Sequence, residues 1–159
     1  MTAAASGERD VAGVIAPPPL IYLAALLLGL GLNALLPSPD SAGTVVVVVG
    51  IALIVAGSAL ALSFVGAFRR AGTAIDPYSR SDHLVTSGPY RLSRNPGYLG
   101  MALVYAGIVA LIPAPWAYLT LAIALVVMDR GVIAREERYL ERRFGDDYRR
   151  YKARTRRWI

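Results

Sequence analysis

A run of 25 residues without a charge, from Thr44 to Phe68, limits the folds open to this chain more than any other feature. A transmembrane helix needs about 20 consecutive apolar residues, so this run is long enough to cross a bilayer. The five valines from Val45 to Val49 would favour a strand in water. In lipid, however, a lone strand leaves its backbone hydrogen bonds unsatisfied. The run therefore predicts a membrane-spanning helix.

Three other apolar runs are bounded by residues that form turns. Leu20 to Leu36 contains one polar side chain, that of Asn33, and is followed by prolines at positions 37 and 39. Tyr98 to Ile112 and Trp116 to Met128 are separated by a Pro-Ala-Pro segment, which predicts a tight helical hairpin. The composition agrees, with 55% hydrophobic residues and a mean hydropathy of +0.47. We expect an all-α, polytopic membrane protein with about four transmembrane helices.

The length of 159 residues predicts a single domain. We expect a mobile N-terminal tail over residues 1–19 and one membrane domain over residues 20–159, with cytoplasmic helices over residues 129–159. The chain has no cysteine and one histidine. This excludes disulfides and thiolate ligands, and one histidine is too few for a histidine-built site, so we expect no metal centre. The oligomeric state is left open by the sequence.

Positive charge is concentrated in two segments of the chain. Residues 69–97 contain five arginines and residues 130–159 contain eleven arginines or lysines, whereas residues 37–43 and 113–115 contain none. Basic residues in short loops stay in the cytoplasm, so we expect both termini and the central loop on the cytoplasmic side of the cell membrane. We attribute the net charge of +6 to this orientation and to contact with membrane lipids, not to nucleic-acid binding.

The central loop, which runs HLVTSGPYRLSRNPGYLG from His83 to Gly100, is polar and rich in turns. Its Gly-Pro-Tyr sequence predicts a tight turn. Arg94 and Asn95 then precede Pro96, a residue suited to the first turn of a helix. The unpaired amides of such a turn attract anions. A basic loop with a helix cap would explain the same residues without any ligand.

A second polar motif, EERYLERRFGDDYRRY, begins at Glu136 on the helix that leaves the last apolar run. Helical spacing puts Glu136 and Glu137 on opposite sides of an apolar stripe, and Arg130 lies near the same face. Acidic residues near a membrane often mark function because their burial is costly. The plainer alternative is a surface helix with Glu–Arg pairs.

Together, the two motifs resemble the isoprenylcysteine carboxyl methyltransferase and phospholipid methyltransferase superfamily, over about residues 80–159. These are integral membrane enzymes that use S-adenosylmethionine. The resemblance implies methyl transfer to a lipophilic acceptor at the cytoplasmic face, with the loop and the C-terminal helices closing a cofactor pocket. It implies that Glu137 and Arg130 act in catalysis. The implied cofactor-binding residues are His83, Leu84, Val85, Gly88, Tyr90, Arg94, Asn95, Pro96, Gly97, Tyr98, Glu136 and Glu137.

The sequence leaves some assignments open. His83 is equally explained as a ligand contact and as a solvated loop residue, and Asn95 cannot titrate, so it is not a general base. The prenylcysteine enzymes carry an arginine about one turn before the first glutamate. Here that residue is Val132, and Arg130 is displaced by two positions, so the acceptor atom could be oxygen, nitrogen or sulfur. The alternatives are a phospholipid-type N-methyltransferase, a relative of NADPH-dependent membrane reductases, and a non-enzymatic lipid-binding or adaptor protein.

Overall fold

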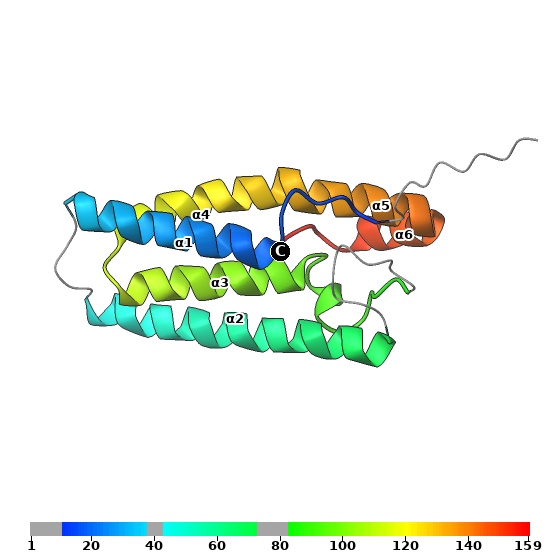
Figure 1. Cartoon of the computed structure of the whole chain (residues 1–159). Helices are drawn as coiled ribbons and strands as arrows, with labels where there is room; N and C mark the ends of the chain where they lie inside the picture. Colours follow the sequence, from blue (N-terminus) through cyan, green and yellow to red (C-terminus); the bar gives the residue numbers. More distant parts are fainter. Residues whose placement is uncertain (1–10, 38–42, 73–82) are drawn as a thin grey trace, which may run out of the picture.

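The computed structural model describes residues 11–37, 43–72 and 83–159, and within these ranges it is built of helices without strands. Four of the helices form an elongated bundle (Figure 1): α1 (Pro18–Leu35), α2 (Thr44–Ala71), α3 (Pro96–Leu111) and α4 (Pro115–Val127). The most extensive packing joins α2 to α3 and α1 to α4. The predicted all-α polytopic fold is confirmed.

Each predicted apolar run is a helix, although the lengths differ. Three helices of the described chain are long and apolar enough to cross a membrane: α1, α2 and the continuous helix Pro115–Phe144. α3 is apolar but has only 16 residues. The helix Pro115–Phe144 contains α4, a π-helical turn η2 (Met128–Ile133) and α5 (Ala134–Phe144). Seven of the eleven residues of α5 are charged, so we treat α5 as lying outside the membrane-crossing part.

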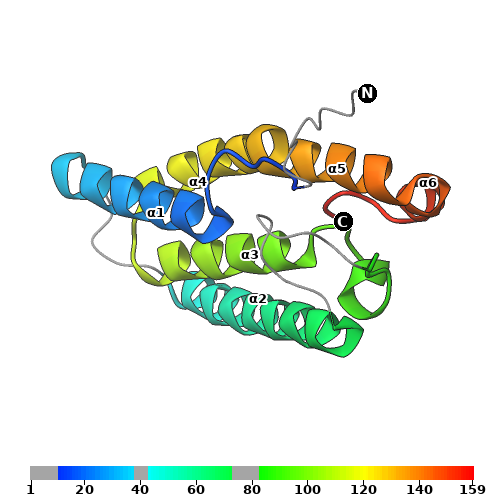
Figure 2. The ribbon, with the colours of Figure 1, turned by 45° about the vertical axis from the view of Figure 1, so that its right-hand side comes forward.

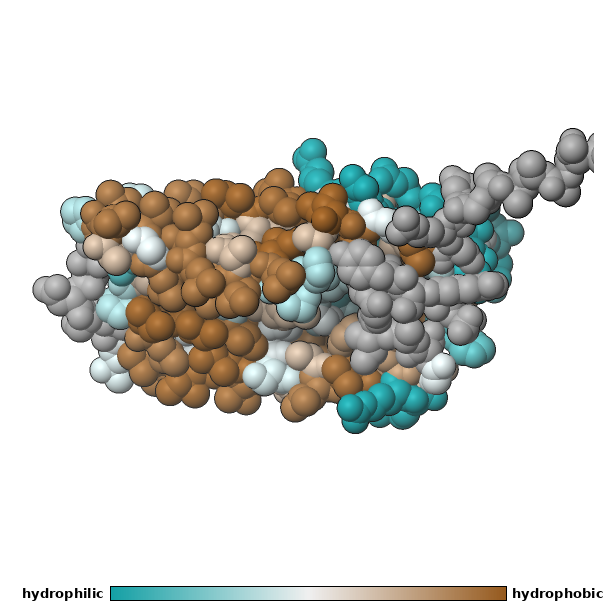
Figure 3. All heavy atoms as spheres, in the orientation of Figure 1, coloured by the Kyte–Doolittle hydropathy of each residue, from teal (hydrophilic) through white to brown (hydrophobic). Residues whose placement is uncertain are grey.

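The surface divides the molecule into an apolar half and a polar end. Large hydrophobic side chains such as Leu28, Leu62 and Val126 point outward from the bundle, as lipid contact requires. Figure 3 shows this hydrophobic surface over the helices and hydrophilic residues gathered at one end. That end, called the polar end from here on, contains α5, the short 3₁₀ helix η1 (Gly88–Arg91) and α6 (Asp146–Arg154).

Small residues bring α2 and α3 into backbone contact within the apolar half. A Cβ atom added at Gly57 would lie 2.6 Å from the carbonyl oxygen of Gly100, and one added at Gly107 would lie 2.6 Å from that of Gly50. The two glycines are seven residues apart on each helix, so the contacts lie on one face. Close packing of this kind is how helices associate in lipid, where burial of apolar side chains provides no driving force.

The N-terminal tail is shorter than we expected from the sequence. Residues 1–10 lie outside the described residues, but α1 already begins at Pro18 and Val14 is buried in the core. The guanidinium of Arg135 donates to the carbonyl oxygen of Gly13 at 3.0 Å. The side chain of Ile15 lies so close to Gly131 that a Cβ there would come within 2.4 Å of it. Apolar residues before the prolines therefore fix residues 11–17 against η2.

After α6 the chain turns back toward the bundle. Figure 2 shows this C-terminal segment, residues 155–159, running between α5 and the start of α3. Gly145 permits the turn between α5 and α6 because its φ of +52° lies in the left-handed region, which favours glycine. The sequence thus brings its last residues beside the central loop, and that junction is where the candidate site lies.

Candidate functional site

A buried ion-pair cluster centred on Glu137 joins three segments of the polar end. Glu137 is only 6% exposed, and both of its carboxylate oxygens are bound. Arg94 of the central loop donates to Oε1 at 2.8 Å, and Arg157 of the C-terminal segment donates to Oε2 at 2.6 Å and to Oε1 at 3.1 Å. Paired guanidinium–carboxylate bonds are strong and directional. The cluster therefore fixes the loop, α5 and the C-terminal segment relative to one another.

The same arginine binds a second carboxylate, that of Asp129 in the π-helical turn. Arg157 Nη1 lies 3.0 and 3.1 Å from the two oxygens of Asp129, and the indole of Trp158 donates to Oδ1 at 3.2 Å. In a regular α-helix, Glu137 would be rotated by about 80° from Asp129. The wider π-helical turn takes up part of this offset, so both acids reach one guanidinium. π-helical turns are frequent at functional sites.

Hydrogen bonds to backbone carbonyl oxygens hold the central loop to α6 and to the C-terminal segment. The amide of Arg94 donates to the carbonyl oxygen of Arg156 at 2.9 Å. The carbonyl oxygen of Arg157 accepts from Ser93 at 3.2 Å and from the side-chain amide of Asn95 at 2.9 Å. Arg94 also donates from Nη1 to the carbonyl oxygen of Lys152 at 3.0 Å. Arg94 and Asn95, which were predicted as ligand contacts, thus also hold these segments together.

One donor within this junction is unsatisfied. Nε of Arg94 is buried and has no hydrogen-bond partner in the described structure, although both terminal nitrogens of the same guanidinium are bound. A buried donor without an acceptor is costly, and native structures normally satisfy it with water or a ligand. Arg94 therefore retains one free direction for an acceptor oxygen.

Glu136 differs from its neighbour in having no cationic partner among the described residues. Its Oε1 accepts a hydrogen bond of 2.6 Å from the hydroxyl of Tyr98 in the first turn of α3. Burial raises the pKa of Glu136 to about 7, the Tyr98 hydrogen bond lowers it, and the charge of Glu137 raises it. A partly buried carboxyl without a counter-charge is suited to receive a cation.

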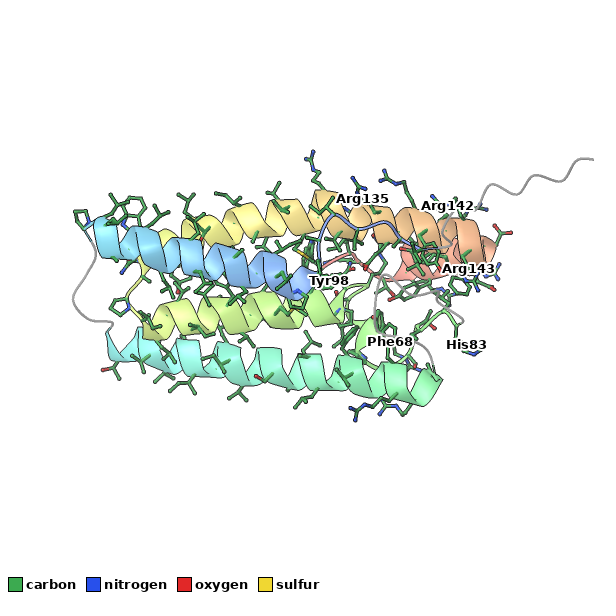
Figure 4. The ribbon with its side chains drawn as sticks, viewed as in Figure 1. Phe68, His83, Tyr98, Arg135, Arg142 and Arg143 are labelled. Carbon is green, nitrogen blue, oxygen red and sulfur yellow. The ribbon has the colours of Figure 1, made fainter. Side chains whose placement is uncertain are left out.

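Aromatic rings form a wall near Glu136. The rings of Phe64 and Phe68 on α2 lie 5.0 Å apart, and the ring of Tyr90 lies 5.9 Å from that of Phe68. Burial, followed by the charge of Glu136, raises the pKa of Tyr90 well above its usual value. Tyr151 of α6 donates to the carbonyl oxygen of Tyr90 at 2.8 Å and so anchors the wall. Figure 4 shows Phe68 near the end of α2, on the side of the central loop.

The structure brings many of the predicted site residues together. Tyr90, Arg94, Tyr98, Glu136 and Glu137 surround the junction. Asn95, Pro96 and Gly97 are buried at the start of α3, where Pro96 begins the helix as predicted. Gly97 leaves room for Phe64, since a Cβ there would lie 3.2 Å from that ring. Leu84 and Val85 are half-buried, and Gly88 makes the predicted turn with φ +61°.

Two predicted residues lie away from the junction. Arg130 is exposed on η2 and makes no hydrogen bond or ion pair within the described chain. His83 is exposed, and its side chain lies at the outer edge of the polar end (Figure 4). Sequence reasoning missed Asp129, Arg157 and the rings of Phe64 and Phe68. Nothing in the residue pattern signals Arg157, which lies among nine basic residues between Arg138 and Arg157.

These features define a helical membrane protein with a preformed charged and aromatic site at one end of the bundle. The chain belongs to the phospholipid methyltransferase family, whose model matches residues 45–147. The match spans α2 to α5 and confirms the resemblance inferred from the sequence. An uncharacterized protein of Haemophilus influenzae (strain ATCC 51907 / DSM 11121 / KW20 / Rd) is 42% identical over 62 residues, which are 39% of this chain and 98% of that protein. No solved structure matches the chain.

Proposed function

We propose that the protein transfers a methyl group from S-adenosylmethionine to a lipophilic acceptor at the cytoplasmic face of the cell membrane. Family membership supports methyl transfer. Two groups of opposite charge beside Glu137 carry the choice of donor. The carboxyl of Glu136 is hydrogen-bonded to Tyr98 but has no cationic partner among the described residues, and Nε of Arg94 has no acceptor. Such a pair suits the amino-acid end of S-adenosylmethionine, which has one ammonium and one carboxylate.

Each part of the site has a role in this proposal. Glu136 binds the ammonium, and Nε of Arg94 donates to the carboxylate. The wall of Phe64, Phe68 and Tyr90 offers flat apolar surface to the adenosine. Glu137 holds the arginines in place and acts as a positioning residue, because both of its oxygens are already bound. We propose no catalytic role for the exposed Arg130.

When bound, the cofactor supplies a methyl group activated by its own sulfonium. The protein has to align the acceptor with that group and exclude water from the site. The C-terminal segment would contribute to water exclusion, because Arg157 bonds to Glu137 of α5 and Trp158 bonds to Asp129 of η2. An acceptor that is already nucleophilic needs little acid–base help.

An apolar groove supports a lipophilic acceptor. It has a volume of about 480 Å³ and lies between α1, α2 and α3, with Leu26, Leu62 and Val104 among its walls. This volume is typical of ligand pockets. Tyr22 lines the groove and donates to the carbonyl oxygen of Tyr98 at 3.2 Å, and the hydroxyl of Tyr98 reaches Glu136. A hydrocarbon chain in the groove would therefore bring its head group to the site.

The groove and the core around Val132 favour an uncharged or basic head group over a carboxylate. Val132 is fully buried in the hydrophobic core, at the position where the prenylcysteine enzymes carry a substrate-binding arginine. No cation can reach the acceptor from this position. Phospholipid-type N-methylation is therefore the second candidate, in agreement with the description of the matching family.

The donor is tested by measuring ligand binding to the protein in lipid nanodiscs. We expect S-adenosylhomocysteine to raise the melting temperature and NADPH to leave it unchanged. Stabilisation by NADPH alone would favour the reductase alternative, and a folded protein that binds neither compound would contradict the proposal. Transfer of a radiolabelled methyl group from S-adenosylmethionine to a membrane lipid extract then identifies the acceptor class.

The proposed orientation requires a separate experiment. The segments rich in arginine and lysine lie at the polar end with the site, so we propose that this end and both termini face the cytoplasm. Reporter fusions at the two termini should both give the cytoplasmic signal. An external signal at either terminus would contradict the orientation.

A further inference from the structure

A second cavity, whose lining includes neither Glu136 nor Arg94, opens beside α6. It has a volume of about 620 Å³ and lies between the segment that leads into η1 and one face of α6. Tyr151 forms one wall and bonds to the backbone of Tyr90, whose ring packs against Phe68 on the side of Glu136. Leu84, one of the cofactor-binding residues that the resemblance implies, also lines this cavity, whereas Glu136, Arg94 and the ring wall do not.

Three of the nine residues that line this cavity are arginines. Arg91 comes from η1, and Arg150 and Arg154 come from α6, whereas Asp147 is the one acidic residue in the lining. Arg150 is paired with Asp147, but both side chains are mostly exposed, so this pair is weak. Arg91 and Arg154 are exposed and have no carboxylate partner among the described residues. The cavity therefore carries an uncompensated positive charge.

Leu84 and three hydroxyl-bearing residues complete the lining. Thr86 and Ser87 come from the loop side, and Thr155 comes from the end of α6. Arg154 donates from Nε to the carbonyl oxygen of Arg150 at 3.2 Å, which fixes the plane of its guanidinium. Arginines from η1 and from α6, together with residues that carry hydroxyls, match an anion whose acceptor oxygens point in several directions.

We propose that this cavity binds a phosphate group. The group could belong to the head of an anionic phospholipid or to a soluble phosphate compound, since the recognition chemistry is the same. A lipid source fits the location, because η1 packs on the end of α2, where Arg69 and Arg70 follow the apolar run. The inference goes beyond the proposed function and does not depend on it.

Two probes distinguish the sources: inorganic phosphate, and dihexanoyl phosphatidylglycerol below its micelle concentration. Each is titrated calorimetrically into the detergent-purified full chain. Binding of phosphate alone would assign a soluble ligand, and binding of phosphatidylglycerol alone or of both probes would assign a lipid head group or a shared site. If neither probe binds to a folded protein, the proposal is wrong.

A pair of matched double variants tests whether binding occurs in this cavity. Arg91→Gln with Arg154→Gln should lower the affinity for the bound probe by about tenfold or more, because two charge-assisted contacts are lost. Arg138→Gln with Arg142→Gln removes the same charge from exposed positions on α5 and should change affinity by less than about twofold. Equal losses in the two variants would indicate non-specific attraction and would overturn the site. The single variant Arg91→Gln, with a loss of at least about threefold expected, replaces the double variant if that one unfolds.

Binding of S-adenosylhomocysteine separates this proposal from the proposed function. Arg91→Gln with Arg154→Gln should bind S-adenosylhomocysteine like the parent. Loss of both ligands would mean that the cavity belongs to the cofactor site, and the second site would then be rejected. If the parent binds phosphate but not S-adenosylhomocysteine, the proposed function fails and the phosphate site stands.

Discussion

The apolar half of the bundle and its polar end are held together by different forces. Between α2 and α3 the backbones touch at Gly50, Gly57, Gly100 and Gly107, and the large side chains point outward. At the polar end, charged side chains point inward and meet at Glu137. Packing in the apolar half depends on glycines, which have no side chain to separate the helices. Packing at the polar end depends on a balance of charges.

Because of this difference, the apolar half supports the site, and the charged side chains of the polar end determine what the site can bind. Steric contacts in lipid resist changes in pH and salt, so the bundle provides a rigid support. The cluster of Glu137, Arg94 and Arg157 builds on this support and leaves Glu136 without a cation. Adjacent glutamates thus have opposite environments, one neutralised and one free to receive a ligand. Substitutions that act on one region and not on the other test this division.

The largest effect on stability should come from Glu137→Gln. The substitution removes the shared carboxylate and leaves the buried guanidinium of Arg94 without a counter-charge. Breaking one side of a buried ion pair costs roughly 3–5 kcal/mol. Thermal unfolding in detergent measures the loss. Glu141→Gln is the matched control, because Glu141 is paired only at the surface with Arg149 and Lys152 and its loss should leave stability nearly unchanged. Equal melting temperatures for the two variants would contradict a central role for Glu137.

A smaller loss should follow from Gly57→Ala in the apolar half. The new Cβ would meet the backbone oxygen of Gly100 at 2.6 Å, and a backbone atom cannot move aside cheaply. Overpacking of this kind costs about 1–3 kcal/mol. Gly31→Ala is the control, since nothing lies within 4 Å of a Cβ at Gly31. Unlike the loss in Glu137→Gln, this loss should be the same at low and high salt. If both glycine variants melt alike, the close helix contact is not significant for stability.

The sequence predicted the apolar half more completely than the polar end, for a physical reason. A long uncharged run such as Thr44–Phe68 can satisfy its backbone hydrogen bonds in lipid only as a helix, so the helices follow directly from composition. The motifs also located Tyr98, Glu136 and the helix start at Pro96. The contact of Arg157 with Glu137 was not predictable, because any of many basic residues could have reached Glu137.

Two further parts of the site depend on geometry that the residue pattern does not encode. Arg157 reaches both Asp129 and Glu137 only because the helix widens into a π-helical turn at η2. Phe64 and Phe68 look like ordinary lipid-facing residues in an apolar run, and only the packing of η1 on α2 brings them beside Tyr90. The catalytic role of Arg130 was implied by the resemblance, and helical spacing placed this residue near the same face as the glutamates. Its exposure on the widened turn gives that role no structural support.

Glu136→Gln should weaken cofactor binding while sparing the fold. Glutamine keeps the hydrogen bond with Tyr98 but cannot pair with an ammonium. A charge-assisted bond contributes roughly 1.5–3 kcal/mol, so the affinity for S-adenosylhomocysteine should fall about tenfold or more. Calorimetry in nanodiscs measures the affinity, with Glu141→Gln again as control. Wild-type affinity in Glu136→Gln would exclude Glu136 as the ammonium partner. A melting temperature lowered as much as in Glu137→Gln would contradict the separate roles of the two glutamates.

The smallest expected effects concern pH, and they follow from the raised pKa of Glu136. Because the folded protein holds this proton more tightly than the unfolded chain does, the contribution of Glu136 to stability is present at low pH. It is lost as the pH rises through about 7. Ligand binding should follow the opposite course, since only the ionised carboxylate attracts an ammonium.

Affinity for S-adenosylhomocysteine should therefore be weaker at pH 6 than at pH 8, by up to about tenfold, because the ionised fraction of a group with a pKa of about 7 changes by that factor. Melting temperature should decline slightly over the same interval. In Glu136→Gln both slopes should disappear, whereas Glu141→Gln should retain them, since the pKa of Glu141 is lowered by Arg149 and Lys152 and that group does not titrate in this range. A binding curve that keeps its slope in Glu136→Gln would assign the pH dependence to the ligand or to another residue.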